Sequence, residues 1–267
     1  MPHPIERLRW VARAEGAGPG VLTREAAVAL ASGGGDVAGM VTGCRRLVDR
    51  HIAVGPVWWL AAKVLVANDP SAEAWAAASE LEADPTSAVL AAHIPDEATV
   101  TVIGWPEQAA EALRRRGDIE VLVVECNGDG RALARRLDAT GVEAFDVPEA
   151  GLGAAVRESG LVLLEASALG PDGFVAQSGS LAAAAVARSL GIDVWVVAGV
   201  GRVLPGRLWQ ALVERLADTD DAWALPDEVV PLDWATSVIG PGGPQSPDEA
   251  WKRADCPVAP ELLRFAG

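Results

Sequence analysis

The chain has 267 residues, of which 50% are hydrophobic, and it carries a formal net charge of −15. This length suffices for one large domain or two smaller ones with a sizeable core. The acidic balance argues against binding to nucleic acid, because the chain has no basic stripe with which to neutralise phosphates. The arginine run at 114–116 lies on a helical pattern and is expected to form a solvated face.

We expect a cytoplasmic protein that does not contact a membrane. The opening segment MPHPIERLRWVARAEG carries charges where a signal peptide needs an apolar stretch. No apolar run approaches the length of a transmembrane helix. The three cysteines, Cys44, Cys126 and Cys256, are widely separated, which is typical of reduced thiols.

Residues 1–95 are expected to form a small helical N-terminal domain. Their apolar residues recur at helical spacing, and the breaks between the helical patterns carry Gly, Pro, Asn or Asp. The tryptophans in this region, Trp58, Trp59 and Trp75, are more typical of a core than of a site. The predicted helices span 4–14, 22–33, 37–54, 57–68, 70–84 and 85–94.

Residues 96–267 are expected to form an α/β domain, because short apolar runs alternate there with helical patterns. Nearly continuous apolar strands indicate a parallel sheet with helices on both faces, which is a Rossmann-like arrangement. The Pro-rich segment 223–267 is expected to contain little regular structure. The predicted strands span 98–104, 119–125, 142–147, 161–166 and 193–199, and the predicted helices 106–117, 129–141, 151–160, 180–191 and 205–218.

The residues that follow the predicted strands are the candidates for a binding site, because ligands of open parallel sheets bind outside the carboxyl ends of the strands. These candidates are Gly104, Trp105, Glu125, Asn127, Glu165, Ser167, Gly199 and Arg202. Arg202 is either an anion contact or a structural arginine. The weak candidates for catalysis are Glu125, Cys126 and Asp146.

The segment formed by Gln177, Ser178, Gly179 and Ser180 directly precedes an Ala-rich helix. Free backbone amides and the positive end of the helix dipole can bind a phosphate or another anion there, and glycine allows a close approach. Alternatively, Ser180 only caps the helix and Gly179 only turns the chain. Both interpretations are open on the sequence.

Other kinds of site are not favoured, and we expect neither a cofactor nor a metal. The segment GVGR after the last predicted strand lacks the third glycine and the acidic residue of a dinucleotide-binding loop. The histidines and cysteines lack the spacing of zinc ligands, and no nucleophile elbow of a hydrolase is present. Neighbouring carboxylates disfavour a thiolate at Cys126, which is expected to be a structural thiol, with ligand contact or a nucleophile as alternatives.

Four segments of the chain share their order of motifs with one known family. Residues 119–147 combine a strand ending in Glu125, a polar link and a Gly-Arg-x-Leu helix, and residues 161–199 combine a turn, a Gly-containing loop, a helix start and a strand. The other two segments are EVVPLDWATSVIGPGGP and DCPVAPELLRF. Together they resemble the family of the alpha, beta and delta subunits of translation initiation factor 2B, which also contains methylthioribose-1-phosphate and ribose-1,5-bisphosphate isomerases.

The resemblance implies a small phosphorylated ligand and a homo-oligomer, usually a dimer formed through the α/β domain. The family's enzymes use a cysteine after the first strand of this domain and an aspartate after a Gly-Ala turn to convert an aldose phosphate into a ketose phosphate. These positions fall on Gly104 and Ser167, neither of which can act as an acid or a base near neutral pH.

The phosphate-binding part of the family pattern is retained only in part. The lysine of the family's helix start falls near Gln177, and the arginine that follows the strand-end glutamate is replaced around Asn127. The positions that agree with the family are Glu125, Gly179 and the small hydroxyl of Ser180.

We therefore expect a divergent member of this family that binds a phosphorylated sugar or nucleotide in a regulatory or assembly role, without isomerase chemistry. The alternative is an aldose–ketose isomerase of a phosphorylated pentose with a rebuilt site, in which Glu125, Asp146 and Glu165 supply the acids. A structural interaction protein with an empty crevice is a third hypothesis. Turnover of a pentose phosphate would separate the second hypothesis from the other two.

Overall fold

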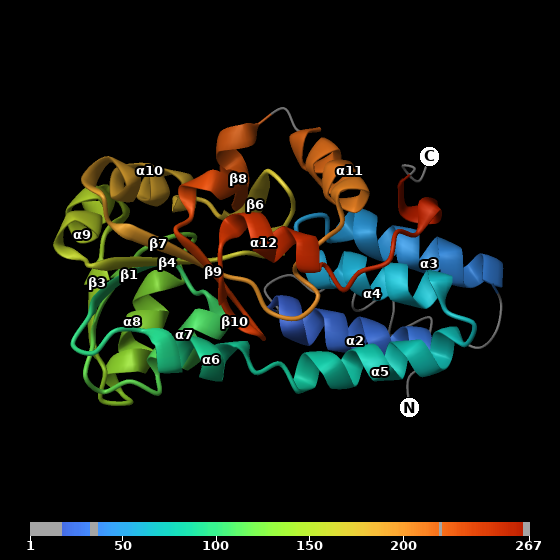
Figure 1. Ribbon diagram of the computed structural model, residues 1–267, viewed down its shortest axis with the longest axis horizontal. Coiled ribbons are helices and arrows are strands. Elements are labelled where there is room, and N and C mark those ends of the chain that lie inside the picture. Colours follow the sequence, from blue (N-terminus) through green and yellow to red (C-terminus); the bar gives the residue numbers. More distant parts are fainter. Residues whose placement is uncertain (1–17, 33–36, 219–220, 264–267) are drawn as a thin grey trace.

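The structure is a computed structural model that describes residues 18–32, 37–218 and 221–263. Helices α2 to α5 lie together at one end of the molecule, and the sheets with their covering helices lie at the other (Figure 1). The helix predicted over 4–14 lies outside the described residues.

The helical part is built around α4, which is apolar around almost its whole circumference. Trp58 and Trp59 of α4 are buried, as predicted, whereas Trp75 of α5 is 50% exposed, so its predicted core position is wrong. Pro70 opens α5, and the carboxylate of Asp69 caps it by accepting hydrogen bonds from two amides of the first turn. The helices of this part are α2 (Pro19–Ala31), α3 (Val37–Arg50), α4 (Gly55–Val66) and α5 (Pro70–Glu82).

The C-terminal part of the chain completes this helical core. Leu208 and Leu212 of α11 (Gly206–Ala217) are buried in the same cluster as Trp58, and so is Leu262 of the short turn η5 (Pro260–Leu263). The expected domains, 1–95 and 96–267, therefore share one apolar core. The boundary between them stays a prediction.

The larger sheet has seven strands in the order β10-β9-β7-β4-β1-β2-β3, which pair in parallel except for β10 with β9. The five predicted strands are all present, which confirms the Rossmann-like α/β fold. The chain runs from β1 outward to β3 and then places β4 on the other side of β1, so the topological switch point lies between β1 and β4. The strands are β1 (Thr99–Ile103), β2 (Glu120–Val124), β3 (Glu143–Val147), β4 (Leu161–Glu165), β7 (Asp193–Val197), β9 (Ser237–Gly240) and β10 (Gly243–Gln245).

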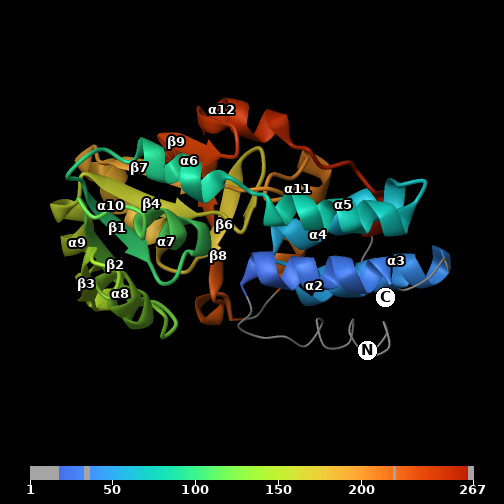
Figure 2. The same cartoon turned by 90° about the horizontal axis from the view of Figure 1, so that it is seen from below.

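Helices cover both faces of this sheet (Figures 1 and 2). On one face, apolar residues of α6, α7 and α8 are buried against β1 and β2, and on the other, alanines of α9 and α10 are buried against β4 and β7. The near-continuous apolar strands follow from this double cover. The helices are α6 (Thr86–His93), α7 (Glu107–Leu113), α8 (Gly130–Asp138), α9 (Leu152–Glu158) and α10 (Ser180–Leu190).

Two segments contain more regular structure than the sequence indicates. The loop between β4 and α10 forms a hairpin that pairs with a strand from the C-terminal segment, giving a three-stranded antiparallel sheet in the order β5-β6-β8. The prediction of little structure over 223–267 is therefore wrong, because strands too short to show a sequence pattern are stabilised by distant partners. The additional elements are β5 (Ala168–Leu169), β6 (Gly173–Gln177), β8 (Asp227–Pro231), α12 (Pro247–Ala250), η1 (Glu149–Gly151), η2 (Ala222–Ala224), η3 (Leu232–Trp234) and η4 (Trp251–Arg253).

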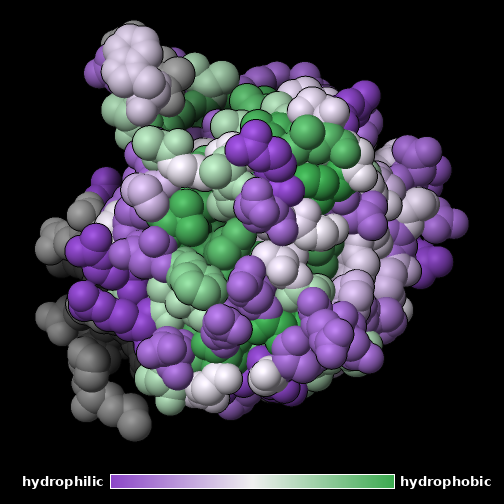
Figure 3. Space-filling model, turned by 90° about the vertical axis from the view of Figure 1, so that its left-hand side faces the viewer, coloured by the Kyte–Doolittle hydropathy of each residue, from purple (hydrophilic) through white to green (hydrophobic). Residues whose placement is uncertain are grey.

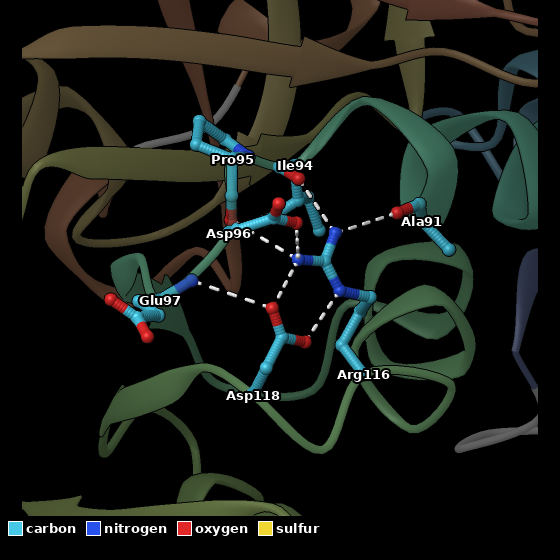
Figure 4. Close-up of polar contacts among 7 residues, drawn as sticks. All are labelled: Ala91, Ile94, Pro95, Asp96, Glu97, Arg116 and Asp118. Carbon is cyan, nitrogen blue, oxygen red and sulfur yellow. Dashed lines mark hydrogen bonds and ion pairs between the residues drawn. The ribbon is translucent and has the colours of Figure 1, made fainter.

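Arg116 does not belong to a solvated face, as the sequence suggested for the whole arginine run. Its side chain is 14% exposed and its guanidinium donates hydrogen bonds to the carbonyls of Ala91 (3.0 Å) and Ile94 (2.6 Å) at the end of α6 (Figure 4). The same group forms ion pairs with Asp118 at 2.6 Å and Asp96 at 3.1 Å. These contacts satisfy carbonyls that the last turn of a helix leaves without a partner. Arg116 thus fixes the link between α6 and β1.

Candidate functional site

A cavity of about 270 Å³ opens at the topological switch point, outside the carboxyl ends of β1 and β4. This is the place at which open parallel sheets bind their ligands. Its apolar wall consists of Pro19, Ile103, Trp105, Pro106, Leu163, Leu164 and Pro226, and its polar wall of Glu107, Asn127, Asp129, Glu165, Ser167, Gln177, Ser180 and Asp227.

The cavity brings together several candidates that lie far apart in the sequence. These residues are Trp105, Asn127, Glu165, Ser167, Gln177 and Ser180. They converge because parallel strands end at the same edge of the sheet, so that the loops after β1, β2 and β4 meet the first turn of α10 there. Gly104, Ser178 and Gly179 are their chain neighbours and shape the two turns.

Glu165, the last residue of β4, is held from two sides. One carboxylate oxygen lies 2.9 Å from the guanidinium of Arg202, and the other accepts hydrogen bonds from the amides of Gln108 and Ala109 in the first turn of α7. The side chains of Arg202 and Glu165 are only 4% and 8% exposed. Arg202 also donates to the carbonyl of Ala166 at 2.6 Å. This is the geometry of a structural arginine, one of the two interpretations that the sequence left open.

The turn before α10 holds a carboxylate of the chain itself. Gly179 has a φ of 98°, in the left-handed region that favours glycine, and α10 begins at Ser180. The amide of Leu181 donates a hydrogen bond of 2.9 Å to Oε1 of Glu228 in β8. Glu228 therefore takes one amide of the turn for which the sequence left an anion site and a plain helix cap as open interpretations.

Glu125 and Asp146, two of the weak catalytic candidates, are engaged in local contacts. Glu125 accepts hydrogen bonds from the amides of Gly128 (2.8 Å) and Arg131 (3.0 Å), and these bonds close the start of α8. Asp146 lies in the edge strand β3 and forms an ion pair of 2.8 Å with Arg131. Neither residue lines the cavity.

Cys126, the third weak candidate, has the environment of an unreactive thiol. Its Sγ donates to the carbonyl of Ser178 at 3.0 Å, and the hydroxyl of Ser178 donates in turn to the carbonyl of Leu225 at 2.6 Å. Burial raises the pKa of Cys126 to about 11, and the carboxylates of Glu149 and Glu125 raise it further. The thiol is thus protonated near neutral pH, whereas a nucleophilic cysteine must ionise.

The side chain of Gln177 lies directly against the backbone of Gly104 at the end of β1. Gly104 has a φ of 57°, and a Cβ at this position would lie 2.1 Å from Oε1 of Gln177. The side-chain amide of Gln177 therefore takes the place into which a side chain at 104 would point. A larger residue there would require Gln177 to move and the backbone to keep a left-handed conformation.

Gly199 lies apart from this site. It lines a second cavity of about 220 Å³ between the helical part and the C-terminal strands, together with Trp59, Gln245 and Arg253. A Cβ at Gly199 would lie within 2.4 Å of side-chain atoms of Gln108 and Asp84. The structure therefore divides the residues that follow the strands between two cavities.

Three carboxylates of the main cavity, Glu107, Asp129 and Asp227, were not among the candidates. Burial raises the pKa of Asp227 to about 6. Burial and the neighbouring charge of Glu165 raise the pKa of Glu107. Glu107 and Asp129 follow strand ends and were recognisable as crevice residues, but at helix starts acids are ordinarily caps. Asp227 lies in a Pro-rich segment and carried no sequence signal.

No group of three or more His, Cys, Asp and Glu side chains in the described part of the chain is placed to hold a metal ion. Among the helices that the structure describes, none is long and apolar enough to cross a membrane.

Several crystal structures share this fold. Translation initiation factor eIF-2B of Pyrococcus horikoshii OT3 is 17% identical, with a TM-score of 0.77 over 94% of this chain and 99% of that chain. The tetrameric eIF2B-beta2-delta2 complex of C. thermophilum is matched at 16% identity and a TM-score of 0.73, over 93% and 92% of the two chains. 5-Methylthioribose 1-phosphate isomerase of P. horikoshii OT3 is 14% identical, with a TM-score of 0.65 over 94% of this chain and 86% of that chain. Identities this low show a common fold.

No curated protein sequence matches this chain. The model of the initiation factor 2 subunit family, in contrast, matches residues 72–225 of the 267. This match spans more than half of the chain, including β1 to α11, and it confirms the resemblance seen in the sequence motifs. The chain therefore belongs to the initiation factor 2 subunit family.

Proposed function

We propose that this chain is a cytoplasmic, non-catalytic member of its family that binds a small molecule in the cavity between β1 and β4. Its role is regulation or assembly rather than turnover. One observation carries this proposal: the position that aligns with the cysteine of the similar enzymes is Gly104, and the amide of Gln177 takes the space of a side chain there. At the other catalytic position, Ser167 lines the cavity without a group that titrates near neutral pH.

The resemblance to sugar-phosphate isomerases suggests a phosphorylated sugar or nucleotide as the ligand. Ser180 supports this expectation, because it lines the cavity in the first turn of α10. Glu228 weighs against it, because its carboxylate already accepts a hydrogen bond in that turn. A phosphate at this position would have to displace Glu228.

Thermal unfolding with a panel of compounds tests the proposed function. The panel contains ribose 1,5-bisphosphate, methylthioribose 1-phosphate, ribose 5-phosphate, AMP, GDP and inorganic phosphate. A compound present at a hundred times its dissociation constant stabilises the native state by about 2.7 kcal/mol. We expect stabilisation by a compound that fits the cavity and no change in that compound by NMR after prolonged incubation. Conversion of an aldose phosphate to a ketose phosphate would show that the protein is an enzyme.

The alternative function, an isomerase with a rebuilt site, is favoured by Asp227 and Glu107. Both line the cavity, and both have a pKa raised by burial, which is the condition for a carboxyl group that exchanges protons near neutral pH. Under this hypothesis, turnover of a pentose phosphate would be lost in Asp227→Asn and retained in Asp146→Asn, since Asp146 lies at the sheet edge.

We also propose that the protein forms a homodimer through the α/β domain. The C. thermophilum relative is described as a tetrameric complex. In this chain, β3 ends the large sheet, and Phe145 of β3 and Leu190 of α10 are exposed apolar residues. Figure 3 shows hydrophobic residues gathered between hydrophilic ones at this end of the molecule. Light scattering should give the mass of a dimer, and Phe145→Asp should lower it; a monomeric wild type would contradict the proposal.

A further inference from the structure

The charged side chains that line the main cavity are all carboxylates. Glu107, Asp129, Glu165 and Asp227 line it, and among the described residues its wall contains no lysine or arginine. Arg202 neutralises Glu165 from behind the wall, at 2.9 Å. The positive charges of Arg202 and Arg24 also act on Glu107, whereas no ion pair is found for Asp129 or Asp227 among the described residues. An anionic ligand would therefore meet a wall whose charged side chains all have its own sign.

The chain's own carboxylates also close the helix starts that surround the cavity. The first amides of α7, α8 and α10 donate to Glu165, Glu125 and Glu228, at distances of 2.8 to 3.1 Å. Free amides at helix starts are the groups that attract phosphate in sheets of this type. Here these amides already have carboxylate acceptors, which weakens the usual source of phosphate affinity.

Trp105 adds a surface that favours a cation. It lines the cavity from the loop after β1, and its ring already attracts the guanidinium of Arg136, 5.9 Å from the ring centroid. An indole ring together with carboxylates is a favourable environment for an ammonium group. Asn127 and Ser167, which also line the cavity, can accept hydrogen bonds from further amine or hydroxyl groups.

We propose that this cavity binds a small organic amine, protonated near neutral pH, in place of the phosphorylated compounds of the similar isomerases. The inference rests on the proposed ligand-binding function and names the charge of the ligand. An ammonium group in this cavity would compensate Asp129 and Asp227, for which no ion pair is found in the described part of the chain, and would add to the partial compensation of Glu107 by Arg24 and Arg202. A phosphate group would add charge of the same sign.

Protonation of the cavity gives this proposal a measurable signature. Burial raises the pKa of Asp227 to about 6, and burial with the charge of Glu165 raises that of Glu107. Asp129 and Glu165 face the same space, Glu228 and Arg202 lie behind its walls, and the charge of Arg24 in α2 acts on Glu107. A bound cation favours the ionised carboxylates, so binding releases protons. Amine affinity should therefore rise as the pH increases through about 6.

Isothermal titration of the full chain with putrescine, glucosamine and ribose 5-phosphate, at pH 5 and pH 8, tests the inference. We expect at least one amine to bind at pH 8 with an affinity about tenfold higher than at pH 5. Ribose 5-phosphate should bind more weakly than that amine. Tighter binding of ribose 5-phosphate would overturn the inference about charge and leave the proposed ligand-binding function intact, whereas no binding of any compound would contradict both.

Variants distinguish the cavity from general attraction to an acidic protein. Asp227→Asn and Glu107→Gln should each weaken amine binding about tenfold, and either variant suffices if the other does not fold. Asp193→Asn is the matched control, because Asp193 is an exposed aspartate at the opposite end of the sheet. Equal losses in Asp193→Asn and Asp227→Asn, or complete loss of binding at 0.5 M salt, would show that the amine follows net charge only.

Discussion

The carboxylate of Glu228 accepts a 2.9 Å hydrogen bond from the amide of Leu181, so a side chain from β8 closes the first turn of α10. Similar enzymes place the phosphate of a substrate near this turn, according to the sequence resemblance. Glu228 therefore competes with any anion for the same amides and the same helix dipole.

Glu228→Gln should open this position to phosphate. The variant keeps a hydrogen-bond acceptor but loses the charge, so we expect it to lose only about 0.3–1 kcal/mol of stability. Ribose 5-phosphate should raise its thermal unfolding midpoint more than that of the wild type. Glu143→Gln, at an exposed position of β3, is the control and should respond like the wild type. An identical response of Glu228→Gln and the control would show that Glu228 does not compete with phosphate for the first turn of α10.

Breaking the buried pair of Glu165 and Arg202 should be costly. Glu165→Gln leaves the 4% exposed guanidinium of Arg202 without its counter-charge, which we expect to lower the free energy of unfolding by about 3–5 kcal/mol. Asp146→Asn removes one partner of the exposed ion pair between Asp146 and Arg131. This variant should lower the free energy of unfolding by less than about 1 kcal/mol. Urea unfolding measures both, and equal losses would contradict the structural role assigned to Arg202.

Arg116→Ala should destabilise the link between α6 and β1. It removes the donors to the carbonyls of Ala91 and Ile94 at the end of α6, and we expect a loss of about 2–3 kcal/mol in urea unfolding. Arg115→Ala removes one exposed pair with Glu111 and should stay within about 0.5 kcal/mol of the wild type. Equal losses of stability at the two positions would support the expectation from the sequence that the whole arginine run is a solvated face.

Asp227 should make stability depend on pH. Its folded-state pKa of about 6 lies above the ordinary value of 3.8, so the folded state binds the extra proton between these pH values. Stability from this group is therefore present below about pH 4 and is lost as the pH rises through about 6. Asp227→Asn should be about 2–3 kcal/mol more stable than the wild type at pH 8 and equal to it at pH 4.

The same comparison separates stability from binding, because Asp227→Asn should be more stable while it binds amines more weakly. Chemical unfolding at a series of pH values measures the stability difference. Asp193→Asn serves again as the control and should show no pH-dependent gain. A constant difference between Asp227→Asn and the wild type across this range would contradict a buried, uncompensated carboxylate.

Substitution at Gly104 should reveal the left-handed backbone at the end of β1. Gly104→Ala places a Cβ on a residue with a φ of 57° and requires the amide of Gln177 to move, so we expect a loss of about 1–2 kcal/mol. Gly153→Ala is the control, because Gly153 lies in α9 with open space around it and should gain up to about 1 kcal/mol. A gain at both positions would mean that Gly104 can adopt an ordinary conformation.

The strands β1, β2, β3, β4 and β7 and the helices between them could be predicted from the sequence because their signals are local. A short apolar run such as residues 161–164 of β4, bounded by glycine and a turn, indicates a buried strand. The place of the site follows from the same pattern, since the loops after β1 and β4 must meet at the switch point. The motifs of residues 119–147 and 161–199, with the two C-terminal segments, also indicated the family, which the family model confirms.

The charge of the site depended on tertiary structure alone. β8, whose hydrogen bonds come from the distant β6, brings Asp227 into the cavity wall and Glu228 to the first turn of α10 behind it. The sequence left Arg202 open as an anion contact or a structural arginine, and folding buries it against Glu165. Pairing between distant segments and the burial of a charge depend on which residues are close in three dimensions. Local sequence patterns do not contain this information. The sequence by itself therefore determined the fold and the place of the cavity, and only the tertiary structure decided which charges line it, because those charges come from segments that meet only in the folded chain.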